Sequence, residues 1–84
     1  MLGNPQVFRE RGLTYRIYFN EGLEPPHVHV VAGDDAAAKF WLDPLSMDWN
    51  RGLSRHQVHQ AQEELRTRHV FFKEQWNAVQ GRKR

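Results

Sequence analysis

The sequence predicts an α+β protein, in which a three- to four-stranded antiparallel sheet precedes one or two C-terminal helices packed on one face. Apolar and polar residues alternate with the two-residue period of strands through the first half, and apolar residues recur every three or four positions through the second. The chain has 84 residues, which predicts a single domain over 1–84. We expect the sheet over about 6–50, the helical part over about 54–80, and a basic tail at 81–84.

The first two strands are predicted at 7–9 and 13–19. Within the longer segment, apolar side chains at odd positions alternate with more polar side chains at even positions. Arg11-Gly12 lies between the two segments, and glycine accepts the positive φ of a tight turn. The pattern therefore predicts a hairpin.

Two further strands are predicted at 27–31 and 36–42. The first begins after Pro25-Pro26, because proline cannot donate a hydrogen bond to a strand ladder. Gly33-Asp34-Asp35 favours a turn between the two strands, and Asp43-Pro44 ends the second. We interpret 45–52 as connecting structure, in which Met47 and Trp49 could add a short edge strand.

This alternation assigns the strand residues to two faces of the sheet. One face is apolar and should be buried beneath the helices; its members are Leu13, Tyr15, Ile17, Phe19, Val28, Val30, Ala38, Phe40 and Leu42. The other face should meet solvent or a ligand; its members are Thr14, Arg16, Tyr18, His27, His29, Lys39 and Trp41. An antiparallel sheet that is solvated on one side normally shows this division.

The segment from Ser54 to Val79 contains no proline or glycine and predicts helix, with Ser54 as the N-cap and Gly81 as the stop. Its apolar stripe consists of Val58, Ala61, Leu65, Phe72, Trp76 and Val79. One continuous helix of this length would measure about 39 Å, whereas a compact domain of this size is about 30 Å across. We therefore expect two helices, about 54–66 and 68–80, that break near Thr67. The alternative is one helix that uses Val70 and Phe71 to join two copies of the chain.

Charge is unevenly distributed along the chain. Residues 1–50 hold four basic and seven acidic side chains, whereas residues 51–84 hold eight basic and three acidic ones. On a continuous helix, a basic edge would form from Arg55, His59, Gln62, Arg66, His69 and Lys73. Such an edge can follow a phosphate backbone or contact an acidic partner, although the same side chains can simply surround the rim of the core.

Several function classes lack their sequence signals. The chain has no cysteine, which removes thiol nucleophiles, cysteine metal ligands and disulfides. No Gly-x-Ser-x-Gly elbow and no glycine-rich phosphate loop is present. No apolar run approaches the roughly 20 residues of a membrane span, and no secretion signal is visible, so we expect a cytoplasmic protein without membrane contact.

His27-Val28-His29 is the sharpest chemical feature of the sequence. Alternate residues of a strand point the same way, so both imidazoles could bind one metal ion. A catalytic zinc usually takes three protein ligands, and the third candidates are Glu21, Glu24 and Asp43. The simpler alternative is that the histidines hydrogen-bond the proline loop or stack on an aromatic neighbour, Trp41.

The same face allows two other kinds of chemistry. His29 could act as a general base while Arg16 or Lys39 binds an anion, as in a small ribonuclease. Tyr18 and Trp41 could instead stack nucleic-acid bases without any reaction.

The run Asn20–Val30, which includes Glu-Pro-Pro-His-Val-His, and the run Ala38–Pro44 resemble the small bacterial family catalogued as domain of unknown function 4160. The resemblance covers most of the chain. It implies a short single-domain α+β protein, whose gene often lies beside another small uncharacterised gene in a toxin–antitoxin-like arrangement. It implies no activity, and the positions that it marks are Glu24, His27, His29, Lys39 and Trp41.

Two functional hypotheses follow. The first is a non-catalytic binding module without a cofactor, acting with a small partner protein or with nucleic acid. The alternative is a hydrolase or ribonuclease that uses His27 and His29 for catalysis, with or without a metal ion. The candidate ligand-binding residues are Arg16, Tyr18, Glu24, His27, His29, Lys39 and Trp41. The candidate contacts to nucleic acid or a partner are Arg55, His59, Arg66, His69 and Lys73.

Overall fold

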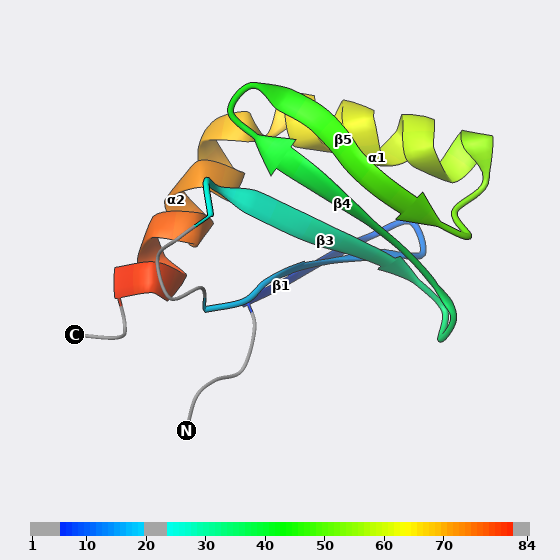
Figure 1. Cartoon of the computed structure of the whole chain (residues 1–84), viewed down its shortest axis with the longest axis horizontal. Coiled ribbons are helices and arrows are strands. Elements are labelled where there is room, and N and C mark those ends of the chain that lie inside the picture. The colour runs from blue at the N-terminus through cyan, green and yellow to red at the C-terminus, as the bar shows by residue number, and fades with distance from the viewer. Residues whose placement is uncertain (1–5, 20–23, 82–84) are drawn as a thin grey trace.

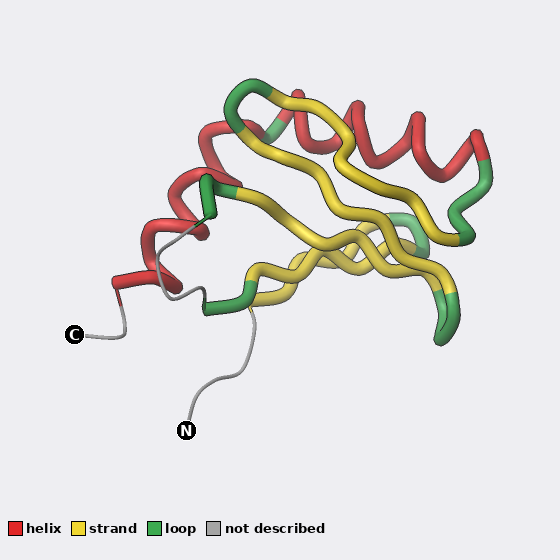
Figure 2. Tube along the Cα trace, viewed as in Figure 1, coloured by secondary structure: helices red, strands yellow, loops and turns green. Residues whose placement is uncertain are grey.

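A computed structural model describes residues 6–19 and 24–81 of the chain (Figure 1). It is an α+β structure, with a five-stranded antiparallel sheet followed by two helices. In chain order the elements are β1 Gln6–Glu10, β2 Leu13–Ile17, β3 His27–Ala32, β4 Ala36–Leu42, β5 Leu45–Arg51, α1 Arg55–Thr67 and α2 His69–Gly81. Each strand pairs with the next, so the spatial order is also β1-β2-β3-β4-β5. Both helices lie on one side of the sheet (Figure 2).

The sheet has one strand more than the three or four predicted. β5 pairs with β4 from Leu42–Leu45 to Ala37–Arg51, in the segment predicted to be a connection with a possible short edge strand at Met47 and Trp49. The register shifts within this pair, since Phe40 lies opposite Met47 but Lys39 lies opposite Trp49. Asp48 is thus the extra residue of a β-bulge. The bulge interrupts the two-residue period by which a strand is recognised, and it turns Met47 and Trp49 toward opposite faces.

Short turns join the strands where the sequence predicts them. Glu10 pairs with Leu13, and the two residues between them, Arg11 and Gly12, have φ angles of 53° and 82°. Positive φ at both positions is the geometry of a tight type I′ hairpin. Gly33 begins the turn between β3 and β4 and also has a positive φ, of 64°.

Another glycine with a positive φ, Gly52, lies in the connection between the sheet and the helices. Gly52 has a φ of 99°, and a Cβ atom at this position would lie 3.1 Å from the Cβ of Ala36. The Asn50 side chain closes the same connection: its Nδ2 donates to the Leu53 carbonyl at 3.0 Å, and its Oδ1 accepts from the Leu53 amide at 2.9 Å. Glycine is required here by both the backbone angle and the close approach of β4.

The core lies between the helices and the sheet face predicted to be apolar. Every predicted strand residue of that face is buried, except that Phe19 is only partly buried against the core. The helices contribute Ala61, Leu65, Phe72, Trp76 and Val79, and Leu53 is buried beneath the connection to α1. This face of the sheet is therefore the one that holds the fold together.

The predicted break in the helical region is confirmed. α1 ends at Thr67, the backbone amide of Arg68 donates to Glu64, and α2 begins at His69. Ser54 caps α1 in a capping box with Gln57, in which each side chain accepts a hydrogen bond from the backbone amide of the other residue. The alternative of one continuous helix is wrong.

Val70 is 69% exposed on α2, but Phe71 packs against Phe8 with ring centroids 5.5 Å apart. Association of two copies through this helix stays a prediction. Of the predicted basic tail, only Gly81 lies within the described residues, and the loop residues 20–23 lie outside them. Neither described helix is long and apolar enough to cross a membrane.

Candidate functional site

The sheet surface that faces away from the helices carries a row of functional side chains across four strands. Arg16 on β2 lies opposite His29 on β3, His29 lies opposite Lys39 on β4, and Lys39 lies opposite Trp49 on β5. We call this surface the open face and define it by Arg16, Tyr18, Glu24, His27, His29, Lys39, Trp41, Asp48, Trp49 and Arg51. All seven predicted ligand-binding residues belong to it.

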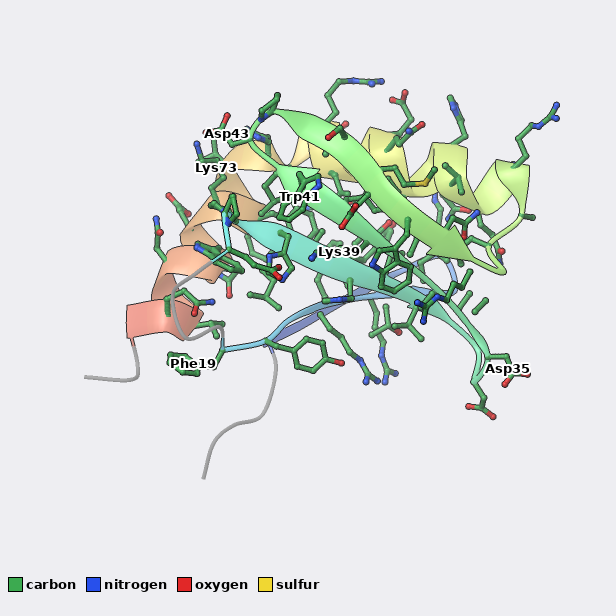
Figure 3. The ribbon with its side chains drawn as sticks, in the orientation of Figure 1. Phe19, Asp35, Lys39, Trp41, Asp43 and Lys73 are labelled. Atoms are coloured by element: carbon green, nitrogen blue, oxygen red, sulfur yellow. The ribbon has the colours of Figure 1, made fainter. Side chains whose placement is uncertain are left out.

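Lys39 is the charged centre of the open face, yet it is only 9% exposed. Its Nζ donates to Glu24 Oε1 at 2.8 Å and lies 3.6 Å from Asp48 Oδ2. The same atom lies 4.4 Å from the centroid of the Trp41 ring (Figure 3). The hydrogen bond from Lys39 lowers the pKa of Glu24 below its ordinary value. The positive charge of Lys39 is thus balanced by two carboxylates of the open face.

His27 is less accessible than the strand pattern predicts, at 7% exposed. Its Nδ1 donates to the Pro25 carbonyl at 2.9 Å, and its ring lies 5.6 Å from the Trp41 ring. Both contacts match the simpler alternative for this histidine. Trp76 of α2 also contacts this side chain, with its ring centroid 4.9 Å from that of His27. His27 is thus packed among residues of the proline loop, the sheet and α2.

His29 lies in the middle of the row and is half-buried. Its ring lies 5.4 Å from Tyr18, 5.5 Å from His27 and 5.9 Å from Trp49. Its Nδ1 is buried and has no hydrogen-bond partner among the described residues. Burial is the largest cause that lowers the pKa of His29, and the charges of His27 and Lys39 act in the same direction. These surroundings favour the neutral form of His29.

The arginines of the open face differ from Lys39 in their surroundings. Within 6–19 and 24–81, no carboxylate forms an ion pair with Arg16 or Arg51, and the Nε of Arg16 has no partner. The guanidinium of Arg51 lies over the Trp49 ring, 4.7 Å from its centroid. Tyr18 is 40% exposed at the neighbouring end of the face. Arginines that pair with none of the described carboxylates thus occur together with aromatic rings on one surface.

The predicted metal site is not assembled by the described residues, in which no group of three or more His, Asp or Glu side chains could hold an ion. Two of the candidate ligands already have hydrogen-bond partners: His27 Nδ1 donates to the Pro25 carbonyl, and Glu24 accepts from the Lys39 ammonium. Of the other third-ligand candidates, Glu21 lies outside the described residues and Asp43 pairs with Lys73 at 3.0 Å (Figure 3). That hydrogen bond lowers the pKa of Asp43.

The basic helix residues are brought together only in part. The break after Thr67 places Arg55, His59 and Arg66 on α1 but His69 and Lys73 on α2. His69 donates from Nε2 to the Leu42 carbonyl, and Lys73 pairs with Asp43, so both attach α2 to the end of β4. Arg66 pairs with Glu63 on its own helix. A ligand-binding role of these residues stays a prediction.

Sequence reasoning missed three members of the open face, namely Asp48, Trp49 and Arg51. All three lie on β5, for which the sequence indicated a connection with at most a short edge strand at Met47 and Trp49. Alternation of Leu45, Met47 and Trp49 was the available signal, but the bulge at Asp48 places Trp49 on the face opposite to the one that strict alternation assigns.

Fold and site together define a small α+β protein, with a helix-covered core on one sheet face and basic, histidine and aromatic side chains on the other. The chain belongs to the family described as Domain of unknown function (DUF4160), whose sequence profile matches residues 12–77, well over half of the chain. The match includes every residue of the open face. No curated protein and no solved structure matches the chain.

Proposed function

We propose that this protein is a binding module for single-stranded nucleic acid and that the open face of the sheet is its binding surface. The observation that carries the proposal is the joint presence, on that face, of accessible aromatic rings and of arginines that pair with no carboxylate among the described residues. Bases stack on aromatic side chains, while guanidinium groups bind phosphate through charged hydrogen bonds.

The two kinds of side chain are placed to act together. Arg16 lies on β2 and Arg51 at the end of β5, so they flank the row that contains His29 and Trp49. With strands about 4.8 Å apart, the distance from β2 to β5 is about 14 Å. This span allows phosphates to contact arginines at either side while bases lie against Tyr18 and Trp49.

A single strand fits this surface better than a duplex. Base stacking on side chains requires unstacked bases, which single strands present. The major groove of B-DNA admits a helix or a two-stranded ribbon, whereas the open face belongs to a five-stranded sheet. An acidic partner protein is the competing occupant, because it would also be attracted by the arginines.

The test is fluorescence anisotropy with labelled single-stranded RNA and DNA of mixed sequence, measured over a range of salt concentrations. We expect the logarithm of the affinity to fall linearly with the logarithm of the salt concentration, by about 0.7 for each phosphate contact. Trp49→Ala should weaken binding about 5- to 150-fold, since one stacked base contributes about 1–3 kcal/mol. Arg16→Gln should weaken binding and reduce the salt slope.

Arg66→Gln is the matched control, because Arg66 is an exposed arginine on α1, outside the open face. We expect it to bind as the unchanged protein does. A loss in Arg66→Gln but not in Arg16→Gln would instead locate the interface on the helical edge. Absent or salt-independent binding would contradict the proposal and leave the small partner protein as the ligand.

A further inference from the structure

We propose that the open face also cleaves RNA, with His29 as the general base and His27 as the general acid. This inference rests on the proposed binding of single-stranded nucleic acid and adds a reaction to it. The two imidazoles share one face of β3, with ring centroids 5.5 Å apart and ring planes at 80°. An RNA linkage that contacts both rings can lose the proton of its 2′-hydroxyl to one imidazole and gain a proton on its 5′-oxygen from the other.

The surroundings of the two rings assign their roles. The Pro25 carbonyl can only accept a hydrogen bond, so Nδ1 of His27 carries a hydrogen and Nε2 is the nitrogen that can exchange protons with a substrate. Glu24 Oε1 lies 3.6 Å from the same Nδ1. His27 thus has a carbonyl and a carboxylate on one side of its ring, which is how proteins orient a histidine for proton transfer.

His29 has the opposite surroundings. Burial disfavours its charged form, and so do the positive charges of His27 and Lys39, whereas Glu24 alone acts the other way. Its Nδ1 is buried, so Nε2 is the nitrogen left to meet a substrate. Two neighbouring titratable groups whose surroundings differ in this way are typical of an acid and base pair.

Charged side chains surround this pair from each adjoining strand. Arg16 lies on the β2 side of His29 and Lys39 on the β4 side. Asp48 from β5 and Glu24 before β3 face Lys39 rather than Arg16. Arg16 is therefore the cation available to bind the phosphate and to stabilise the negative charge that develops on its oxygens.

The reaction is a transesterification within the RNA strand. Nε2 of His29 takes the proton of the ribose 2′-hydroxyl, and the 2′-oxygen forms a bond to phosphorus. The bond from phosphorus to the 5′-oxygen of the next nucleotide breaks, and that oxygen takes a proton from Nε2 of His27. The products are a 2′,3′-cyclic phosphate and a free 5′-hydroxyl, and exchange with water restores both histidines. DNA lacks the 2′-hydroxyl and is bound without being cut.

The experiment uses the full chain with a labelled RNA that contains every dinucleotide step, and with a DNA of the same sequence, both in EDTA. Anisotropy measures binding, and gel electrophoresis with end-group analysis measures cleavage. We expect cyclic-phosphate ends from the RNA and none from the DNA. His29→Ala should reduce cleavage at least about 100-fold, the lower end of general-base contributions, while it retains most of the binding.

His56→Ala, purified in the same way, is the control, because it removes an exposed histidine of α1 outside every candidate site and should leave cleavage unchanged. His27→Gln tests the acid, with circular dichroism to verify its fold. In the unchanged protein cleavage should decline at low pH, where a protonated His29 cannot act as the base, and His27→Gln should reduce cleavage at every pH while this decline persists.

RNA that is bound but not cut would overturn the proposed reaction and leave the binding function standing. Cleavage that persists in His29→Ala would also overturn it. Absence of both binding and cleavage would overturn this inference together with the proposed function.

Discussion

The two faces of the sheet use the same strands in different ways, and β4 shows the contrast most clearly. Ala38, Phe40 and Leu42 are fully buried beneath the helices. Lys39 and Trp41 alternate with them and point to the face that no helix covers. Lys39 is nevertheless buried, because Glu24, Asp48 and Trp41 surround its ammonium group. Apolar burial is thus concentrated on one face, whereas the other carries the charged and aromatic side chains of the open face.

The contrast is tested most strongly by one truncation on each face. Phe40 is completely buried, so Phe40→Ala should lower the free energy of unfolding by about 3–5 kcal/mol. Trp49→Ala, on the open face, should lower it by less than about 2 kcal/mol, because Trp49 is only partly buried. Urea denaturation measures both values. An equal loss of unfolding free energy in the two variants would show that the open face contributes as much to stability as the core.

A smaller effect is expected at Gly52, where the chain leaves the sheet for the helices. Gly52→Ala combines a strained φ of 99° with a Cβ contact of 3.1 Å to Ala36, so it should destabilise by about 2–4 kcal/mol. Gly33→Ala is the control: its φ is also positive, but a Cβ atom there meets nothing within 4 Å. We expect about 1–2 kcal/mol for Gly33→Ala. Equal decreases of the thermal midpoint in the two variants would show that the Ala36 contact does not contribute to the effect.

The open face should also make stability depend on pH, in a direction set by His29. Its pKa is lowered in the folded protein, so below the unfolded value of about 6.5 the unfolded chain binds more protons. The free energy of unfolding should therefore fall as the pH falls from about 7 toward the folded pKa of His29. Urea denaturation at several pH values measures this slope, and His29→Gln should flatten it.

The carboxylates act in a separate range of pH. The lowered pKa values of Glu24 and Asp43 contribute stability above their unfolded values of about 4, and this stability is lost as the pH falls through their folded values. An unchanged slope in His29→Gln between about pH 5 and 7 would therefore contradict the assignment to His29.

The smallest effect is expected at Tyr15 in the core. Its hydroxyl is buried without a partner among the described residues, and burial raises the pKa of Tyr15 above its ordinary value. Tyr15→Phe should therefore stabilise the protein by about 0–1 kcal/mol, because it removes an unsatisfied polar group. Thermal denaturation measures the change, with the exposed Tyr18→Phe as the control. A clear loss of stability in Tyr15→Phe would reveal a partner for the hydroxyl.

The sequence was sufficient for features that depend on local periodicity. Strict alternation around Tyr15 and Phe40 predicted the core face, and helix length predicted the break near Thr67. Features that depend on contacts distant in sequence were missed. Trp76 contacts His27 from a helix some fifty residues away in the sequence, and no residue close to His27 in the sequence indicates this contact. The bulge at Asp48 likewise concealed the full length of β5 and the face that Trp49 occupies, because one extra residue reverses which side chains share a face.

That bulge has a consequence for how copies of the protein meet one another. β5 is an outer strand, and in the described part of the chain nothing pairs with its outer backbone edge. A regular edge of this kind is a template for strand addition and aggregation. The extra residue disrupts the spacing of backbone groups that an incoming strand would need, and it carries a negative charge. The bulged and negatively charged β5 is therefore a poor template for strand addition by a second copy.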